Sequence, residues 1–174
     1  FDEPAFIYVF DAFQNRIDKI PVELDFQQNI PVDVNNPCLV SPPNVCAESA
    51  SYIFDIMLPD SPGGYNIVYQ RCCRNETITN IVTPGDVGTT YVGTIPDPGA
   101  AACNTSPKFK EFPPVAICAN ELLVFDHSAE EPDGDVLVYE LCRPYIGGSP
   151  ACPQPGSNNC GNAGEEVPPP PYDL

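Results

Sequence analysis

The sequence predicts an all-β fold, an Ig-like β-sandwich stapled by disulfide bonds. Three observations support this prediction: apolar residues alternate with a period of two, proline is abundant, and cysteine is dense. The 174 residues include 23 prolines and 9 cysteines. Each proline in a helix interior costs about 3 kcal/mol, so this composition excludes long helices. Short strands joined by turns tolerate it.

The first expected strand pair lies at the start of the sequence. Residues 5–12 form an apolar strand, residues 13–15 form a turn, and residues 16–26 return with alternating apolar side chains. Pro21 lacks a backbone N–H, so it places the second run at a sheet edge or in a bulge.

A second hairpin is expected from residues 52–58 and 65–69, because both runs alternate and a turn rich in Pro and Gly separates them. Further strands are expected at 77–82 and 89–95. The turn between them contains Pro84-Gly85-Asp86, which is typical turn chemistry.

The second half of the chain carries shorter strand signals. The Pro-rich stretch 96–114 is a candidate domain joint, and it precedes short expected strands at 115–118, 121–126 and 136–142. From Gly147 onward Gly, Pro, Asn and Ser dominate. The four prolines near the end favour polyproline II, and this tail could dock along a groove of a neighbour.

The charge balance excludes several functions. The chain carries 24 acidic and 7 basic residues, a formal net charge of −17. Nucleic-acid binding needs a cationic surface, and anionic membranes would repel the chain. No apolar run approaches the 18 or so residues of a membrane span, so we expect no membrane insertion.

The cysteines indicate a disulfide framework formed in an oxidising compartment. A single histidine argues against the usual mixed zinc sites. The expected disulfide cysteines are Cys38, Cys46, Cys72, Cys73, Cys103, Cys118, Cys142, Cys152 and Cys160. Nine is odd, so either one thiol is free or its partner lies outside this chain.

Two local disulfides are predicted, Cys38–Cys46 and Cys152–Cys160, because each pair closes a short loop rich in Pro and Asn. Cys72 and Cys73 are adjacent, and neighbours on a strand point to opposite faces. We therefore expect them to bond to different distant partners. The candidates in this chain are Cys103, Cys118 and Cys142.

A dense acidic loop precedes the expected strand at 136–142. Its candidate Ca²⁺ ligands are Asp126, Glu130, Glu131, Asp133 and Asp135. Calcium takes six to eight oxygen ligands, which such a loop could supply in part, although the EF-hand pattern is absent. The alternative is a solvated turn built on Pro132-Asp133-Gly134. No other cofactor is expected.

An enzyme has little support in the sequence. His127 lies between Asp126 and Ser128, but the members of a catalytic triad converge from separate places in a fold. The G-x-S-x-G motif is absent. We expect no catalytic residues.

One run is highly specific: Pro-Gly-Gly-Tyr-Asn-Ile-Val-Tyr-Gln-Arg-Cys-Cys-Arg-Asn at 62–75. It resembles the N-terminal region of large secreted surface proteins of Bacteroidota, of the PKD-domain or gliding-motility-associated kind. The resemblance covers nearly the whole chain. It continues through residues 81–85, 106–109, 118–120, 125–129, 132–135 and 141–142.

The resemblance implies export by the type IX route and a place on the cell surface or in extracellular filaments. It implies an upstream strand pair with a cysteine that would pair the odd one here, a further candidate partner for Cys72 or Cys73. It also implies two domains: an Ig-like sandwich at 1–107 and a partial second cadherin-like or PKD-like domain at 108–174. Glu131 departs from the Asp usual at that position and weakens the carry-over of a cation site.

The favoured function is therefore a non-enzymatic structural or adhesive module of a bacterial surface protein or filament. Its expected partners are other copies or neighbouring domains, contacted through sheet edges. The alternative is a carbohydrate-binding module of a secreted multidomain hydrolase, which would contact surface glycans. A cluster of exposed aromatic residues on one sheet face would favour that alternative.

Overall fold

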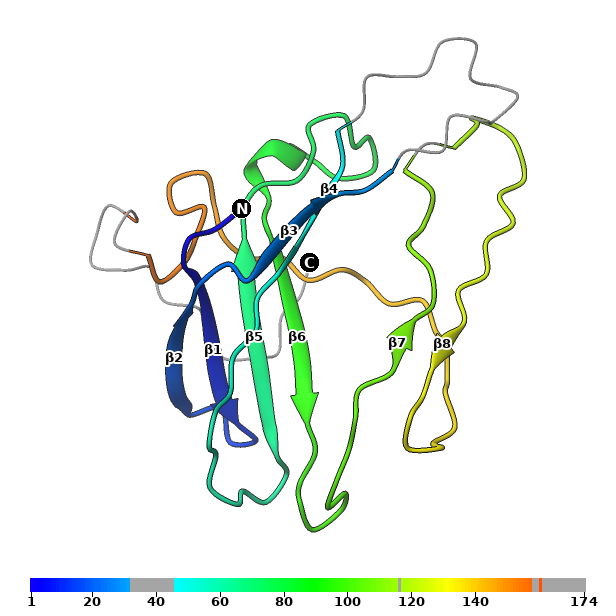
Figure 1. Ribbon diagram of the computed structural model, residues 1–174. Helices are drawn as coiled ribbons and strands as arrows, with labels where there is room; N and C mark the ends of the chain where they lie inside the picture. Colours follow the sequence, from blue (N-terminus) through cyan, green and yellow to red (C-terminus); the bar gives the residue numbers. More distant parts are fainter. Residues whose placement is uncertain (32–45, 116, 158–159, 161–174) are drawn as a thin grey trace. The chain divides into compact units, whose positions relative to one another are not determined.

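A computed structural model of the chain describes residues 1–31, 46–115, 117–157 and 160 (Figure 1). Its strands are β1 (Ala5–Asp11), β2 (Arg16–Val22), β3 (Phe26–Asn29), β4 (Glu48–Ser51), β5 (Tyr65–Arg71), β6 (Thr89–Ile95), β7 (Lys108–Phe109) and β8 (Ala129–Glu130). The short 3-10 helix η1 (Pro84–Asp86) occupies the expected turn. Every ladder among these residues is antiparallel, and the one helical element is a short 3-10 turn, so the all-β prediction is confirmed.

The chain divides into two compact units, each built from separate segments. The first contains Phe1–Leu24, Tyr52–Cys103 and Tyr139–Leu174, and the second contains Asp25–Ser51 and Asn104–Val138. One boundary lies close to the expected joint at 107. The contiguous division into 1–107 and 108–174 differs from this arrangement, because 25–51 and 139–174 each belong with the other half.

The first unit contains a four-stranded sheet in the order β2-β1-β5-β6. β1 and β2 form the expected hairpin. The Asp11 carboxylate closes its turn by accepting the backbone N–H groups of Phe13 at 2.9 Å and Asn15 at 2.8 Å. β2 is an edge strand, as Pro21 predicts.

Both faces of the central strand β1 are buried. Tyr8 and Phe10 lie on one face with Val68 of β5, and these three side chains form the core, with Phe6 packed against them. We call this the core face. Ile7 of β1 lies opposite Tyr69 of β5 on the other face, which we call the tyrosine face.

Two expected strands in this half do not form. Residues 52–58 keep an alternating pattern of half-buried and exposed side chains but join no ladder. β5 already has β1 on one side and β6 on the other, so it has no free edge for a hairpin partner. Residues 77–82 form turns and bends instead of a strand.

The second unit contains two short ladders, β3 with β4 and β7 with β8. The expected strands at 121–126 and 136–142 do not form. The described residues of the expected strand at 115–118 are not in a strand either. Five of the apolar side chains in 121–142 are more than four-fifths exposed: Leu122, Val124, Val136, Val138 and Leu141. Cys38 and the Pro-rich end of the tail lie outside the described residues.

Candidate functional site

The acidic loop uses its carboxylates separately. Asp126 accepts the N–H of Ser128 at 2.9 Å, which lowers the pKa of the Asp126 carboxyl. Glu131 accepts the N–H of Asp135 at 2.7 Å, and Asp133 accepts the N–H of Thr105. Asp126 and Glu131 therefore stabilise local turns, whereas Asp133 joins the acidic loop to the backbone of Thr105.

No three acidic, histidine or cysteine side chains gather as a metal-binding set anywhere in the described part of the chain. The candidate Ca²⁺ ligands therefore do not form such a set among the described residues. His127 instead makes edge-to-face ring contacts with Phe109 and Phe125, at centroid distances of 5.5 and 4.9 Å.

The disulfide prediction is correct for one pair. Cys152 and Cys160 are bonded, with their Cα atoms 4.6 Å apart. The Cys38–Cys46 prediction is wrong, because Cys46 is an exposed free thiol. A short loop between two cysteines permits a bond but does not bring their sulfur atoms together.

The prediction for Cys72 and Cys73 is also wrong, because they bond to each other. It assumed an extended strand through both residues, whereas β5 ends at Arg71 and the peptide between the two cysteines is cis, with their Cα atoms 3.0 Å apart. Of the proposed partners, Cys103 and Cys142 are exposed free thiols. Cys118 is disulfide-bonded, but not to this pair.

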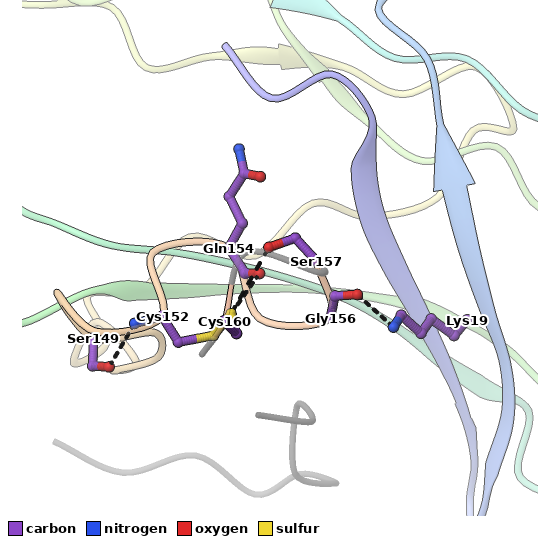
Figure 2. The surroundings of a disulfide bond; sticks show 7 residues. All are labelled: Lys19, Ser149, Cys152, Gln154, Gly156, Ser157 and Cys160. Carbon is purple, nitrogen blue, oxygen red and sulfur yellow. Dashed lines mark hydrogen bonds between the residues drawn. A yellow bond between two sulfur atoms is a disulfide. The ribbon is translucent and has the colours of Figure 1, made fainter. Parts of the chain in front are cut away.

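The Cys152–Cys160 loop covers the core face of the sheet (Figure 2). Lys19 of β2 donates from Nζ to the carbonyl oxygen of Gly156 at 2.5 Å. The same ammonium group lies 4.9 Å from the ring centre of Phe6 and 5.9 Å from that of Tyr8. One cation thus joins the loop to the aromatic core beneath it.

The chain enters this loop by crossing the ends of β5 and β6. The N–H of Thr90 donates to the carbonyl oxygen of Tyr145 at 3.3 Å, and Gln70 donates from Nε2 to Thr90 Oγ1 at 2.8 Å. A Cβ atom on Gly147 would collide with the side chains of Gln70 and Thr90, so a larger residue there would have to displace them. These contacts hold the segment against the sheet.

A buried carboxylate lies at the same end of the sheet. Asp2 is 1% exposed; its Oδ1 pairs with the Arg71 guanidinium and its Oδ2 accepts the Tyr69 hydroxyl at 2.6 Å. The Asp2 carbonyl oxygen accepts the Tyr52 hydroxyl at 2.8 Å. Burial, and then the hydrogen bond to Asp2, raise the pKa of Tyr69 far above its usual range.

Sequence reasoning missed this cluster, although Tyr69 and Arg71 both stand in the specific run at 62–75. The basic residues beside the two cysteines are engaged in structural contacts. Arg74 donates from its guanidinium to the carbonyl oxygens of Gly88 at 3.2 Å and Tyr145 at 2.9 Å. The cluster stabilises the fold, and it supplies no arrangement of nucleophile and base.

The strongest candidate for an interaction surface is the outer edge of β6. We define the β6 edge as residues 91–95, all of which are exposed. Within the described residues β6 has a neighbouring strand only on its β5 side, apart from the single bridge between Thr90 and Tyr145. An unpaired edge presents backbone N–H and C=O groups that another strand can bind.

The two edges of the sheet differ in how they are protected. β2 carries Arg16, Asp18, Lys19 and Pro21, which are the residue types that discourage strand addition. β6 has the sequence Thr-Thr-Tyr-Val-Gly-Thr-Ile, with no charge and no proline. The β6 edge is therefore the edge suited to pairing with another strand.

The tyrosine face offers a smaller candidate surface. Tyr69 and Tyr91 lie opposite each other on β5 and β6 and stack with a centroid distance of 6.1 Å. Tyr91 is 60% exposed. An exposed aromatic ring is a common platform for an apolar ligand face.

No helix in the described ranges is both long enough and apolar enough to cross a membrane. The two described disulfides fit a protein of an oxidising compartment. Comparison of the chain with protein-family models, curated proteins and solved structures finds no match.

Proposed function

We propose that this chain is a non-enzymatic structural or adhesive module that binds other copies or neighbouring domains through the β6 edge. The observation that carries the proposal is the contrast between the protected edge β2 and the uncharged, exposed edge β6. Natural sheets rarely leave a long edge strand without charge or proline unless it pairs with something.

The geometry of β6 defines how a partner would bind. The N–H of Thr90 points away from β5, toward Tyr145. Backbone direction alternates along a strand, so Val92 and Thr94 also direct their N–H and C=O groups outward. A partner strand would bind these groups by β-augmentation.

The proposal includes an extracellular location. Disulfide bonds, the net charge of −17 and the resemblance to secreted Bacteroidota surface proteins support a type IX exported module on the cell surface or in a filament. The exposed apolar side chains in 121–142 support an Ig-like or PKD-like sandwich that reaches its full packing only beside further strands.

A charge placed on the β6 edge tests the proposal. Val92→Lys should weaken concentration-dependent self-association, measured by sedimentation velocity, by about tenfold or more, because the partner strand would have to desolvate the ammonium group. Ile17→Lys is the matched control, since Ile17 is an exposed residue of the other edge. Equal behaviour of both variants, or a strictly monomeric parent chain, would contradict edge-mediated assembly.

The second candidate is a carbohydrate-binding module, favoured by the exposed Tyr91 stacked on Tyr69. A pyranose ring can stack on such an aromatic surface. Affinity electrophoresis in polysaccharide gels would detect binding, and Tyr91→Ala should abolish any retardation. Val92→Lys should leave it intact, because Val92 lies on the opposite face of β6.

A further inference from the structure

The β6 edge has a candidate partner within the same unit. The backbone of Tyr145 forms an antiparallel bridge with Thr90, at the start of β6. The Tyr145 carbonyl oxygen accepts from both the Thr90 N–H and the Arg74 guanidinium. The bridge is therefore anchored from two sides.

The residues just before Tyr145 have a strand-like sequence but no ladder. Residues 136–142, Val-Leu-Val-Tyr-Glu-Leu-Cys, are mostly apolar and rich in residues that favour strands, and residues 140–144 are all exposed in the structure. Leu141 is fully exposed. A strand-like segment and an unpaired strand edge thus begin at the same bridge.

The bridge sets the register that any extension would follow. Counting outward in antiparallel order, Val92 faces Arg143, Gly93 faces Cys142 and Thr94 faces Leu141. Val92 and Thr94 direct their hydrogen-bonding groups outward, and both Arg143 and Leu141 have a backbone N–H to offer. The ladder can therefore be completed at both positions.

The only proline of the segment fits this register. Pro144 would lie opposite Tyr91, at a position whose hydrogen-bonding groups point away from β6. A proline is tolerated there because its missing N–H would face the new outer edge. A shift of one residue would place Pro144 against an outward-facing carbonyl group and would leave that group unpaired.

Side-chain placement agrees with the same register. Leu141 would lie beside Thr94 on the core face, the face that also holds Val92 and Val68. Gly93 has open space where a Cβ atom would stand, so its neighbour Cys142 would meet no obstruction. Pairing would therefore cover part of the exposed apolar surface of Leu141.

We propose that residues 140–144 close the β6 edge as a fifth antiparallel strand that extends from the Thr90–Tyr145 bridge. Closure occupies the outward N–H and C=O groups that a partner strand would need. It therefore regulates the assembly suggested above, and this regulatory part rests on the proposed function. The pairing itself does not.

An engineered disulfide tests the register. Gly93→Cys, made together with Cys46→Ser and Cys103→Ser, leaves Cys142 as the one natural free thiol among the described cysteines. Gly93 and Cys142 would form a non-hydrogen-bonded pair, with Cα atoms about 4.5 Å apart, which a disulfide can span. Oxidised glutathione is added as the oxidant. It takes up the two electrons and two protons that the two thiols release when the disulfide forms, and yields two molecules of glutathione.

Closure predicts an intrachain disulfide between the cysteine introduced by Gly93→Cys and Cys142, identified by non-reducing peptide mapping. Thr94→Cys in the same background is the matched control. Its side chain lies on the opposite face, so its bond to Cys142 should be at least about tenfold less abundant. Thermal unfolding of both reduced variants would establish that each is folded.

An interchain bond at the same positions, or equal bonding in both variants, would overturn intrachain closure. So would the absence of any bond to Cys142. Sedimentation velocity of the reduced protein tests the proposed edge assembly independently of the disulfide result. A bonded chain whose reduced form stays monomeric supports closure and contradicts edge assembly, whereas an unbonded chain that self-associates does the reverse.

Discussion

Cys72 donates its backbone N–H to the carbonyl oxygen of Pro153 at 2.9 Å. This bond joins the vicinal disulfide at the end of β5 to the loop closed by Cys152 and Cys160. Cys72 is buried, whereas Cys73 is exposed. The end of the sheet and the loop that covers its core face are therefore held together by main-chain contact as well as by side chains.

Removing the loop disulfide should destabilise the protein. The double substitution Cys152→Ser and Cys160→Ser should lower the free energy of unfolding by about 2–3 kcal/mol, because the unfolded chain regains the freedom of the loop. Denaturant titration would measure the change. Cys103→Ser, at an exposed free thiol, should stay within about 0.5 kcal/mol of the parent. Equal effects of the two changes would contradict the role of the loop.

The thiols should react selectively in the folded protein. Iodoacetamide should label Cys46, Cys103 and Cys142, which are exposed and free. It should not label Cys72, Cys73, Cys152 or Cys160 unless a reductant is added, because their sulfur atoms are in disulfides. Mass spectrometry of the labelled peptides would test this pattern, and labelling of Cys72 or Cys73 without reductant would refute the vicinal bond.

Two glycines with positive φ allow the stability cost of an unfavourable backbone conformation to be measured apart from the cost of a steric clash. Gly64 has φ +74°, and a Cβ atom there would collide with the carbonyl oxygen of Ile95. Gly134 has φ +84° but open space around it. Gly134→Ala should cost about 1–2 kcal/mol, the conformational term alone, and Gly64→Ala should cost clearly more. Similar losses in thermal stability would show that the Ile95 contact relaxes freely.

Alkaline pH should destabilise the fold through Tyr69. Burial raises the pKa of its hydroxyl in the folded state above the usual value of about 10. The neutral Tyr69 hydroxyl contributes its full share to the free energy of unfolding below about pH 10. This share is lost as pH rises toward the folded pKa, because the tyrosine loses its proton first in the unfolded state. Denaturant midpoints between about pH 8 and 11 would record the fall. The denaturant midpoint of Tyr69→Phe should fall less steeply with pH than that of the parent protein. Identical slopes for the two proteins would exclude Tyr69 as the cause.

Breaking the Asp2 cluster should also destabilise the protein. Asp2→Asn removes the negative charge that faces Arg71 and accepts from Tyr69. Breaking a buried pair costs about 3–5 kcal/mol, and because the Arg71 side chain is 43% exposed we expect about 1–3 kcal/mol. Asp18→Asn, at an exposed position of β2, is the control. Unchanged unfolding of Asp2→Asn would show that water replaces the carboxylate.

Strands were predictable where local alternation coincides with available pairing. β1 and β2 are joined by a short turn, and β6 is rich in β-branched residues, so local sequence was sufficient there. Residues 52–58 show the limit. Their alternation correctly reports which side chains are half-buried, but burial against a sheet does not require membership in its ladder.

The chemistry of the candidate sites was less predictable because it depends on distant contacts. A run of acids such as 126–135 has the same sequence whether its carboxylates converge on an ion or accept separate N–H groups. Asp2 carries no local signal, since its partners Tyr69 and Arg71 lie far along the chain. Cysteine connectivity likewise depends on where β5 ends.

The unequal edges of the sheet also limit the number of partner strands that it can bind. The charged residues and Pro21 of β2 discourage strand addition on one side, so of the two described edges of this sheet β6 is the one that, under the proposed function, accepts a partner. A building block with one such contact forms pairs that are complete in themselves, because each partner uses its single edge on the other. Continuous growth into a filament would therefore require a second, chemically different contact elsewhere on the chain.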